Sequence, residues 1–126
     1  MSWHDAHAHC QNLNGDLASF FSQEEVDGIP TAVGDKFHWI GLNDQLKENI
    51  WVWSDGSTTT WLNWKNGQPN DGEQGNCVYM KKGKLYDNLC HEGWPFLCKI
   101  PGIYLKIDVT GVATICALII TDFKSN

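Results

Sequence analysis

The chain has 126 residues, a length that is typical of a single folded domain. Its formal net charge is −6 at pH 7, whereas nucleic-acid-binding domains present a basic face, so the composition excludes nucleic acid as the expected partner. Hydrophobic residues make up 42% of the chain and include seven Trp, which supplies enough apolar surface for a packed core.

The first third of the chain predicts two short helices around a strand. Ser2 followed by Asp5 is typical of a helix N-cap, and apolar residues recur at helical spacing as far as about Leu13, before Gly15. Residues 17–20 predict a short strand. Ser22 with Glu25 then predicts a second helix, which Gly28 and Pro30 interrupt.

The middle of the chain predicts strands separated by one long loop. A core strand over 37–42 is followed by a polar loop and by an alternating apolar segment at 51–53. Residues 65–76 form a polar stretch of a length that is usually functional or disordered. A hairpin over 77–86, turning at Lys82-Gly83, and a closing strand at 96–98 complete the pattern.

The five Cys match neither a zinc-finger spacing nor a C-x-x-C redox motif. Disulfide bonds in an extracellular domain are therefore the better interpretation. No signal-peptide pattern stands at the start of the chain, and no apolar run reaches the roughly 20 residues that a membrane span needs. We expect a piece of a longer secreted protein or of the ectodomain of a membrane receptor.

The most informative segment is Gln68-Pro69-Asn70, within the long polar loop. Two amide side chains flank a rigid proline; their oxygens can coordinate a hard cation, and their NH groups can donate to sugar hydroxyls. Taken alone, a Gln-Pro-Asn turn beside Asp and Gly is ordinary loop chemistry.

Together with Trp39-Ile40-Gly41-Leu42 upstream and the cysteines downstream, this loop resembles the sugar-binding loop of the C-type lectin-like domain family. The resemblance spans about 2–100, and a macrophage mannose receptor-type repeat is the nearest subgroup by motif. It implies an α+β fold in which two helices pack on small antiparallel sheets. The domain would cover 1–100, and 101–126 would be an extension of uncertain structure.

The resemblance also implies two disulfides, Cys10–Cys98 and Cys77–Cys90. The remaining Cys116 is either a free buried thiol or the site of an intermolecular bridge. The family's N-terminal strand, which pairs with the closing strand, is missing from this chain. Leu105, Ile107 and Val109 alternate with polar residues as a strand should, and 112–120 could return as a second strand. We therefore expect part of 104–120 to cover the vacant edge, the alternative being a tail without settled structure.

The resemblance further implies two neighbouring Ca²⁺ positions. Carried over residue by residue, the sugar-binding position comprises Gln68, Asn70 and Asp87, while Gly75 and Tyr86 stand where the family has two further ligands. Because this position keeps one carboxylate, we expect weak Ca²⁺ binding, which Gly75→Glu should tighten. Glu73 lies nearby but two residues out of position.

The second implied Ca²⁺ position comprises Asp44, Glu48 and Asp71, with Asn76 where an acid is usual. In the family, Glu-Pro-Asn accompanies mannose-type sugars and Gln-Pro-Asp accompanies galactose-type sugars. The chain has Gln-Pro-Asn, a hybrid that does not fix the hydroxyl geometry. The retained Asn70 favours mannose, fucose or N-acetylglucosamine slightly.

Other candidate sites are weaker. His4, His7 and His9 do not share one helix face, so a solvated or half-buried helix is favoured over a metal site. Four Trp between 51 and 64 are interpreted as core packing rather than as a sugar-stacking platform.

No catalytic spacing of Ser, His, Asp or Cys occurs, so we expect a binding module and not an enzyme. The leading partners are glycans or glycoproteins. The rival prediction is a Ca²⁺-independent module that binds a protein ligand on the same scaffold; an ice-binding role has no sequence mark here. The sequence does not give the oligomeric state.

Overall fold

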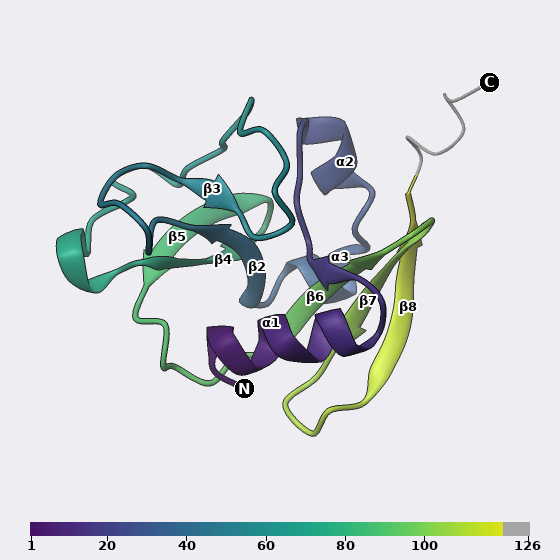
Figure 1. Cartoon of the computed structure of the whole chain (residues 1–126). Coiled ribbons are helices and arrows are strands. Elements are labelled where there is room, and N and C mark those ends of the chain that lie inside the picture. Colours follow the sequence, from purple (N-terminus) through teal and green to yellow (C-terminus); the bar gives the residue numbers. More distant parts are fainter. Residues whose placement is uncertain (120–126) are drawn as a thin grey trace.

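A computed structural model describes residues 1–119 and has an α+β architecture built on one sheet (Figure 1). The strands lie in the order β5-β4-β2-β6-β7-β8, with β1 pairing to β6 and β3 pairing to β2. The helical elements are α1 (Trp3–Asn12), α2 (Gln23–Asp27), α3 (Thr31–Gly34) and the 3-10 turn η1 (Gly72–Gln74). The strands are β1 (Asp16–Leu17), β2 (His38–Asn43), β3 (Val52–Trp53), β4 (Cys77–Lys81), β5 (Lys84–Asn88), β6 (Phe96–Ile100), β7 (Ile103–Ile107) and β8 (Ala113–Leu118).

The core divides into two clusters because neighbouring residues of a strand point to opposite faces. On β2, Trp39 packs with the buried side of α1, whereas Ile40 and Leu42 pack in the cluster that includes Val26 of α2. Phe96 and Leu97 of β6 alternate between the clusters in the same way. The helices and loops thus cover both sides of the central strands.

Helix α1 begins as its sequence predicts. The backbone N–H of Asp5 donates to Ser2 Oγ at 3.2 Å, which satisfies one of the free donors of the first turn. Trp3, Ala6 and Cys10 form the buried side of the helix. The indole Nε1 of Trp3 donates to the carbonyl oxygen of Ile40 at 2.8 Å, which fixes the helix against β2.

The helical half departs from the predicted elements in two places. The expected strand over 17–20 is only β1, although Ala18 continues the pairing through a 2.9 Å bond from its N–H to the carbonyl oxygen of Leu97. Helix α2 ends at Asp27 with Gly28 as its C-cap, and a third short helix, α3, begins directly after Pro30, because proline is compatible with the start of a new helical turn.

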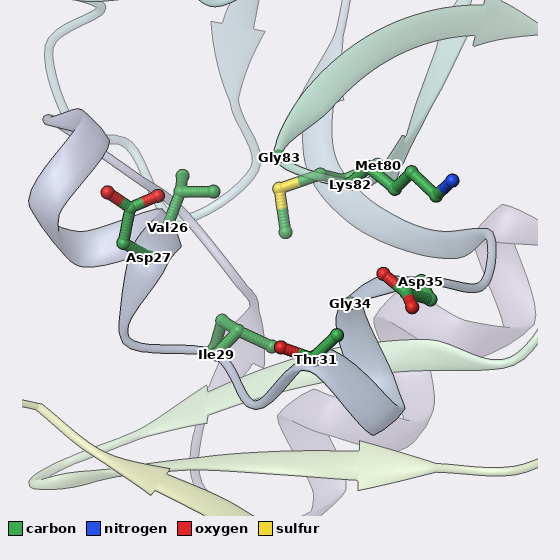
Figure 2. A pocket seen from close by; sticks show the side chains of 9 residues that line it. All are labelled: Val26, Asp27, Ile29, Thr31, Gly34, Asp35, Met80, Lys82 and Gly83. Atoms are coloured by element: carbon green, nitrogen blue, oxygen red, sulfur yellow. The ribbon is translucent and has the colours of Figure 1, made fainter.

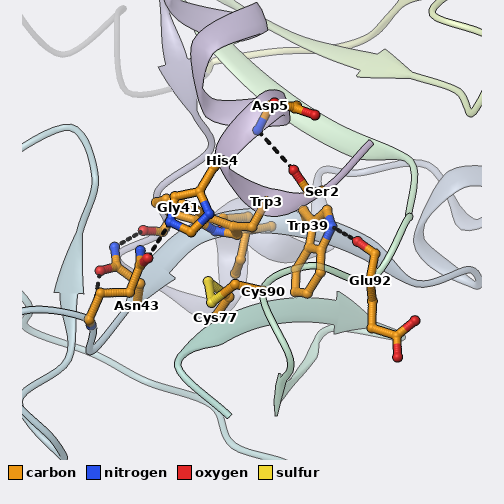
Figure 3. The surroundings of a disulfide bond; sticks show 12 residues. Ser2, Trp3, His4, Asp5, Trp39, Gly41, Asn43, Cys77, Cys90 and Glu92 are labelled. Atoms are coloured by element: carbon orange, nitrogen blue, oxygen red, sulfur yellow. Dashed lines mark hydrogen bonds between the residues drawn. A yellow bond between two sulfur atoms is a disulfide. The ribbon is translucent and has the colours of Figure 1, made fainter. Parts of the chain in front are cut away.

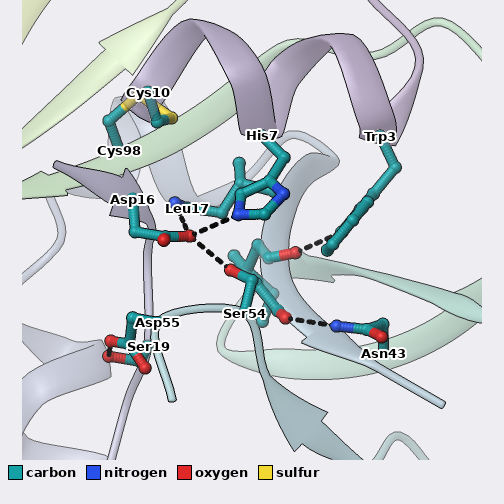
Figure 4. Close-up of polar contacts among 12 residues, drawn as sticks. Trp3, His7, Cys10, Asp16, Leu17, Ser19, Asn43, Ser54, Asp55 and Cys98 are labelled. Atoms are coloured by element: carbon teal, nitrogen blue, oxygen red, sulfur yellow. Dashed lines mark hydrogen bonds and ion pairs between the residues drawn. A yellow bond between two sulfur atoms is a disulfide. The ribbon is translucent and has the colours of Figure 1, made fainter. Parts of the chain in front are cut away.

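The structure contains both disulfides that the resemblance implies, Cys10–Cys98 and Cys77–Cys90, and Cys116 is unpaired. The first joins α1 to β6 beside a polar network in which Asp16 contacts His7 at 3.1 Å (Figure 4). The second joins β4 to the segment after β5 beneath α1, in the surroundings of Trp3 and Trp39 (Figure 3).

The predicted return of the C-terminal segment to the closing strand is confirmed. Strand β7 pairs antiparallel with β6 over its whole length, and β8 then pairs with β7. Tyr104 and Ile107 of β7 are buried, so the hairpin contributes side chains to the core as well as covering an edge. Val109, expected to continue the alternation, lies outside β7 and is 70% exposed, while Ile120 is outside the described residues.

Candidate functional site

The long polar loop is held against β5 by a buried carboxylate. Asp87 is 3% exposed, and its Oδ1 and Oδ2 accept hydrogen bonds from the backbone N–H groups of Asn70 and Asp71 at 2.8 and 2.9 Å. The backbone N–H of Asp87 in turn donates to Gln68 Oε1 at 3.2 Å. Gln68, Asn70 and Asp87 therefore meet at one place in the fold.

These contacts change what the three residues offer to a ligand. Both carboxylate oxygens of Asp87 already accept a bond from the loop backbone, and the amide oxygen of Gln68 already accepts one from the backbone of β5. Each oxygen retains a second lone pair, but the first use of this carboxylate is to fix the loop. The Asn70 side chain is exposed.

A second acidic group lies at the end of β2. Asp44 is 2% exposed, and its Oδ2 accepts a 2.8 Å bond from the N–H of Asn49. Its Oδ1 is buried and receives no hydrogen bond from the described residues as long as Glu48 is ionised. A protonated Glu48 carboxyl can donate a hydrogen bond to Asp44. The N–H of Asp44 donates to the carbonyl oxygen of Asn76 at 3.0 Å, so this aspartate is tied to the end of the long loop.

The two acidic groups lie within electrostatic reach of each other. Partial desolvation, followed by the negative charge of Asp44, a hydrogen bond between the two side chains and the charges of Glu73 and Asp87, raises the pKa of Glu48. Desolvation and the charge of Asp87 likewise raise the pKa of Asp71. The second predicted set, Asp44, Glu48 and Asp71, therefore shares one acidic region with Asp87 and Glu73.

The oxygen chemistry of this region fits Ca²⁺, which prefers carboxylate and carbonyl oxygens. An unpartnered buried oxygen on Asp44 and two carboxylates with raised pKa values are what a bound cation would relieve. Over residues 1–119, however, no three His, Cys, Asp or Glu side chains stand close enough to hold a metal ion together. Side chains such as the exposed Asp71 would have to swing inward to complete a coordination shell.

Gly75 has a structural role that its sequence position does not reveal. A Cβ at this residue would lie 2.3 Å from Asp71 Cβ and 2.7 Å from Asp87 Oδ2, closer than real contacts allow. The absence of a side chain therefore lets Asp71 and Asp87 close over the glycine. The tighter Ca²⁺ binding expected for Gly75→Glu stays a prediction, and this geometry adds that Asp71 or the loop must shift to accommodate the new side chain.

Tyr86 stands at the second position where the family has a further ligand, and it belongs to an aromatic cluster. Alternation along β5 places it on the opposite face from Asp87. Its ring centroid lies 5.4 Å from that of Phe37 and 5.6 Å from that of Tyr79. The residue contributes to packing and supplies no amide oxygen near the loop.

The His and Trp residues of the sequence take structural positions. His4 contacts Gln45, His7 contacts Asp16, and His9 packs edge-on to Phe96, so the three histidines have separate partners. Trp53 is buried, and Trp51, Trp61 and Trp64 pack against the same core cluster. The prediction of core packing for these Trp is confirmed.

A hollow of about 170 Å³ lies apart from the loop, between α2, α3 and the β4–β5 turn (Figure 2). Val26, Ile29 and Met80 supply apolar walls, and Asp27 and Lys82 lie at its edges. None of the predicted site residues lines it. It carries no convergent set of polar groups that would indicate a ligand.

Comparison with known proteins identifies relatives along most of the chain. The family model for the lectin C-type domain matches residues 1–100. The mouse low affinity immunoglobulin epsilon Fc receptor is 42% identical over 90 residues, which are 70% of this chain and 27% of the receptor. The chain thus spans about a quarter of the length of that relative.

Solved structures give the same result. The cow carbohydrate-recognition domain of CD23, crystallised in the presence of GlcNAc2Man3 oligosaccharide, is 36% identical with a TM-score of 0.68, covering 73% of each chain. A calcium-independent type II antifreeze protein is 30% identical with a TM-score of 0.67, covering 73% of this chain and 72% of its own. No helix within residues 1–119 is both long and apolar enough to cross a membrane.

Proposed function

The chain belongs to the C-type lectin domain family, and we propose that it binds glycans with the help of Ca²⁺ through the Gln68-Pro69-Asn70 loop. One observation carries the proposal: Asp87 fixes this loop by two backbone bonds at the border of a group of mutually repelling carboxylates. A cation would neutralise the carboxylates and hold the loop in place.

We place the cation with Asp44, Glu48 and Asp71 rather than within the Gln68, Asn70 and Asp87 group. Asp44 offers a buried oxygen that lacks a partner while Glu48 is ionised, whereas the oxygens of Asp87 and Gln68 already hold the loop. Ca²⁺ binding at this second position would be weak, because Asp71 and Glu48 must move to reach the ion. The sugar-binding position, in which Gly75 and Tyr86 replace two ligands, would bind more weakly still.

The sugar would be recognised by the exposed amide of Asn70 and by the second lone pairs of Gln68 and Asp87. Such groups pair with two adjacent hydroxyls, each of which is both donor and acceptor. Mannose, fucose and N-acetylglucosamine are the first sugars to test. The domain would act on glycoproteins outside the cell, in keeping with its two disulfides.

A Ca²⁺-independent module that binds a protein ligand is the alternative. It is supported by the hydrogen bonds that already engage the side-chain oxygens, from the loop backbone to Asp87 and from the β5 backbone to Gln68, and by the missing side chain at Gly75. In this case the loop is rigid without a cation and presents its surface to a protein.

Calorimetric titration with Ca²⁺ separates the two functions. The lectin proposal predicts saturable weak binding, lost in Asp44→Asn, together with retention on mannose or N-acetylglucosamine resin that EDTA reverses. Asn70→Ala should abolish retention on the resin while leaving Ca²⁺ binding within about twofold. Absence of Ca²⁺ binding at millimolar concentration, with an unchanged fold, would reject the lectin proposal and favour the alternative.

A further inference from the structure

Two adjoining hollows lie at the end of β2 opposite the long loop. They share Lys36 and Pro95, and their volumes are about 320 and 250 Å³. They lie by His38, where β2 begins, whereas Asp44 follows the other end of this six-residue strand. At about 3.4 Å per residue, the two ends are roughly 20 Å apart, so the hollows are separate from the proposed Ca²⁺ region. We call the pair the β2 groove.

Lysine ammonium groups gather along the β2 groove although the chain as a whole is acidic. Lys36 lines both hollows, Lys81 lines the larger one, and Lys106 lines the smaller one. The three come from separate parts of the chain, namely the segment after α3, the end of β4, and β7. Their convergence is a product of the fold.

One of the carboxylates in the groove is hydrogen-bonded within its own turn. Asp108 Oδ1 accepts bonds from the N–H groups of Thr110 and Val112 and from the Thr110 hydroxyl, all within its own turn. These bonds, and to a smaller extent the positive charge of Lys106, lower the pKa of Asp108, so this carboxylate stays ionised. Asp35 is the other acidic residue at the groove, so three lysines and two carboxylates line it, and the lysines are in excess.

His38 adds a hydrogen-bond acceptor to the floor. Its Nδ1 lies 2.9 Å from the carbonyl oxygen of Lys36, which can only accept, so Nδ1 carries the proton and Nε2 is left as an acceptor. No described residue donates to Nε2. Burial, followed by the charges of Lys106 and Lys36, lowers the pKa of His38, which keeps the ring neutral at pH 7.

Apolar surface flanks the charged groups. Phe37, Trp94 and Pro95 line the larger hollow, and the ring centroids of Phe37 and Trp94 lie 5.5 Å apart. The ammonium of Lys81 sits 4.7 Å from the Phe37 ring centroid, a cation–π contact that positions it at the wall. Aromatic side chains beside hydrogen-bonding groups suit the apolar face of a sugar ring.

We propose that the β2 groove is a second, Ca²⁺-independent site that binds an acidic saccharide carrying sulfate or carboxylate groups. Lys36, Lys81 and Lys106 contact the anionic groups, the walls at Trp94 and Pro95 contact the sugar ring, and His38 Nε2 accepts from a hydroxyl. A fully charged peptide would meet the same lysines but would leave the apolar wall and the histidine acceptor unused.

Binding of a heparin tetrasaccharide, measured by calorimetry in EDTA at 50 and 150 mM NaCl, tests the proposal. The double variant Lys36→Gln/Lys106→Gln should weaken binding at least tenfold and flatten the salt dependence. Lys47→Gln/Lys65→Gln, which removes two exposed charges elsewhere, is the matched control and should stay within about twofold. Equal losses in both variants, or no saturable binding by the wild type at 50 mM NaCl, would overturn the proposal.

Two further measurements identify the class of ligand and where on the protein it binds. Inorganic sulfate and polyglutamate at matched charge should bind at least tenfold more weakly than the tetrasaccharide; equal binding of either would reject a saccharide site. The ring signals of His38 and the indole signal of Trp94 should move in NMR spectra on addition of the tetrasaccharide, and their constancy would place it elsewhere. Because every arm contains EDTA, failure of the Ca²⁺-dependent function leaves this test unaffected.

Discussion

Replacing Asp87 by Asn tests whether this carboxylate is the anchor of the long loop. The substitution keeps the size of the side chain and one acceptor oxygen. It places an NH₂ group, a donor, against one of the two backbone N–H groups that now bond to the carboxylate, those of Asn70 and Asp71. One bond is lost, and the other changes from a charged acceptor to a neutral one.

The magnitude follows from these two bonds. A hydrogen bond to a charged group contributes about 1.5–3 kcal/mol, and a buried group left without a partner costs about 1–3 kcal/mol. Asn70 and Asp71 are exposed, so water replaces part of what is lost. We therefore expect Asp87→Asn to lower the free energy of unfolding by about 2 kcal/mol, a factor of roughly 30 in the unfolding equilibrium.

Urea unfolding followed by Trp fluorescence, with both disulfides oxidised and EDTA present, gives this free energy. Glu73→Gln is the matched control, because it removes one negative charge from the same region but breaks no hydrogen bond of the loop anchor. It should change the free energy of unfolding by less than about 0.5 kcal/mol. A loss of less than 0.5 kcal/mol in Asp87→Asn, or an equal loss in the control, would refute the anchoring role.

Three further outcomes are expected. Without Ca²⁺, Asp71→Asn should leave stability unchanged or slightly raised, because it removes repulsion with Asp87, and it should weaken Ca²⁺ binding at least fivefold in calorimetry. The lowered pKa of His38 means that the unfolded chain takes up a proton more readily, so stability should fall as the pH drops below about 6.5, and His38→Gln should flatten this dependence in urea titrations; an unaltered profile would contradict the assignment. Deleting 102–126 removes β7 and should cause aggregation or a clear loss of thermal stability by exposing the edge of β6, whereas an unchanged melting curve would show that the hairpin contributes nothing.

The sequence by itself determined the local elements and the family. A capping Ser before an apolar helical spacing defines α1, and a Lys-Gly turn between apolar runs defines the β4–β5 hairpin, because both signals act within a few residues. The cysteine positions and the Trp39-Ile40-Gly41-Leu42 strand were sufficient for the resemblance that the family match supports.

Only the tertiary structure decided how the site residues are used. Asp87 could be assigned as a ligand from its position, but its buried bonds to the loop backbone depend on a contact 16 to 17 residues away along the chain. In the same way, the sequence shows only that Gly75 lacks the side chain of a ligand, whereas the fold shows that Asp71 and Asp87 pack closely against this glycine. The β2 groove had no sequence signal at all, because its lysines come from segments that become neighbours only when β2, β4, β6 and β7 pair in one sheet. Local patterns fix what a segment becomes, whereas the chemistry of a site depends on long-range pairing that no local pattern encodes.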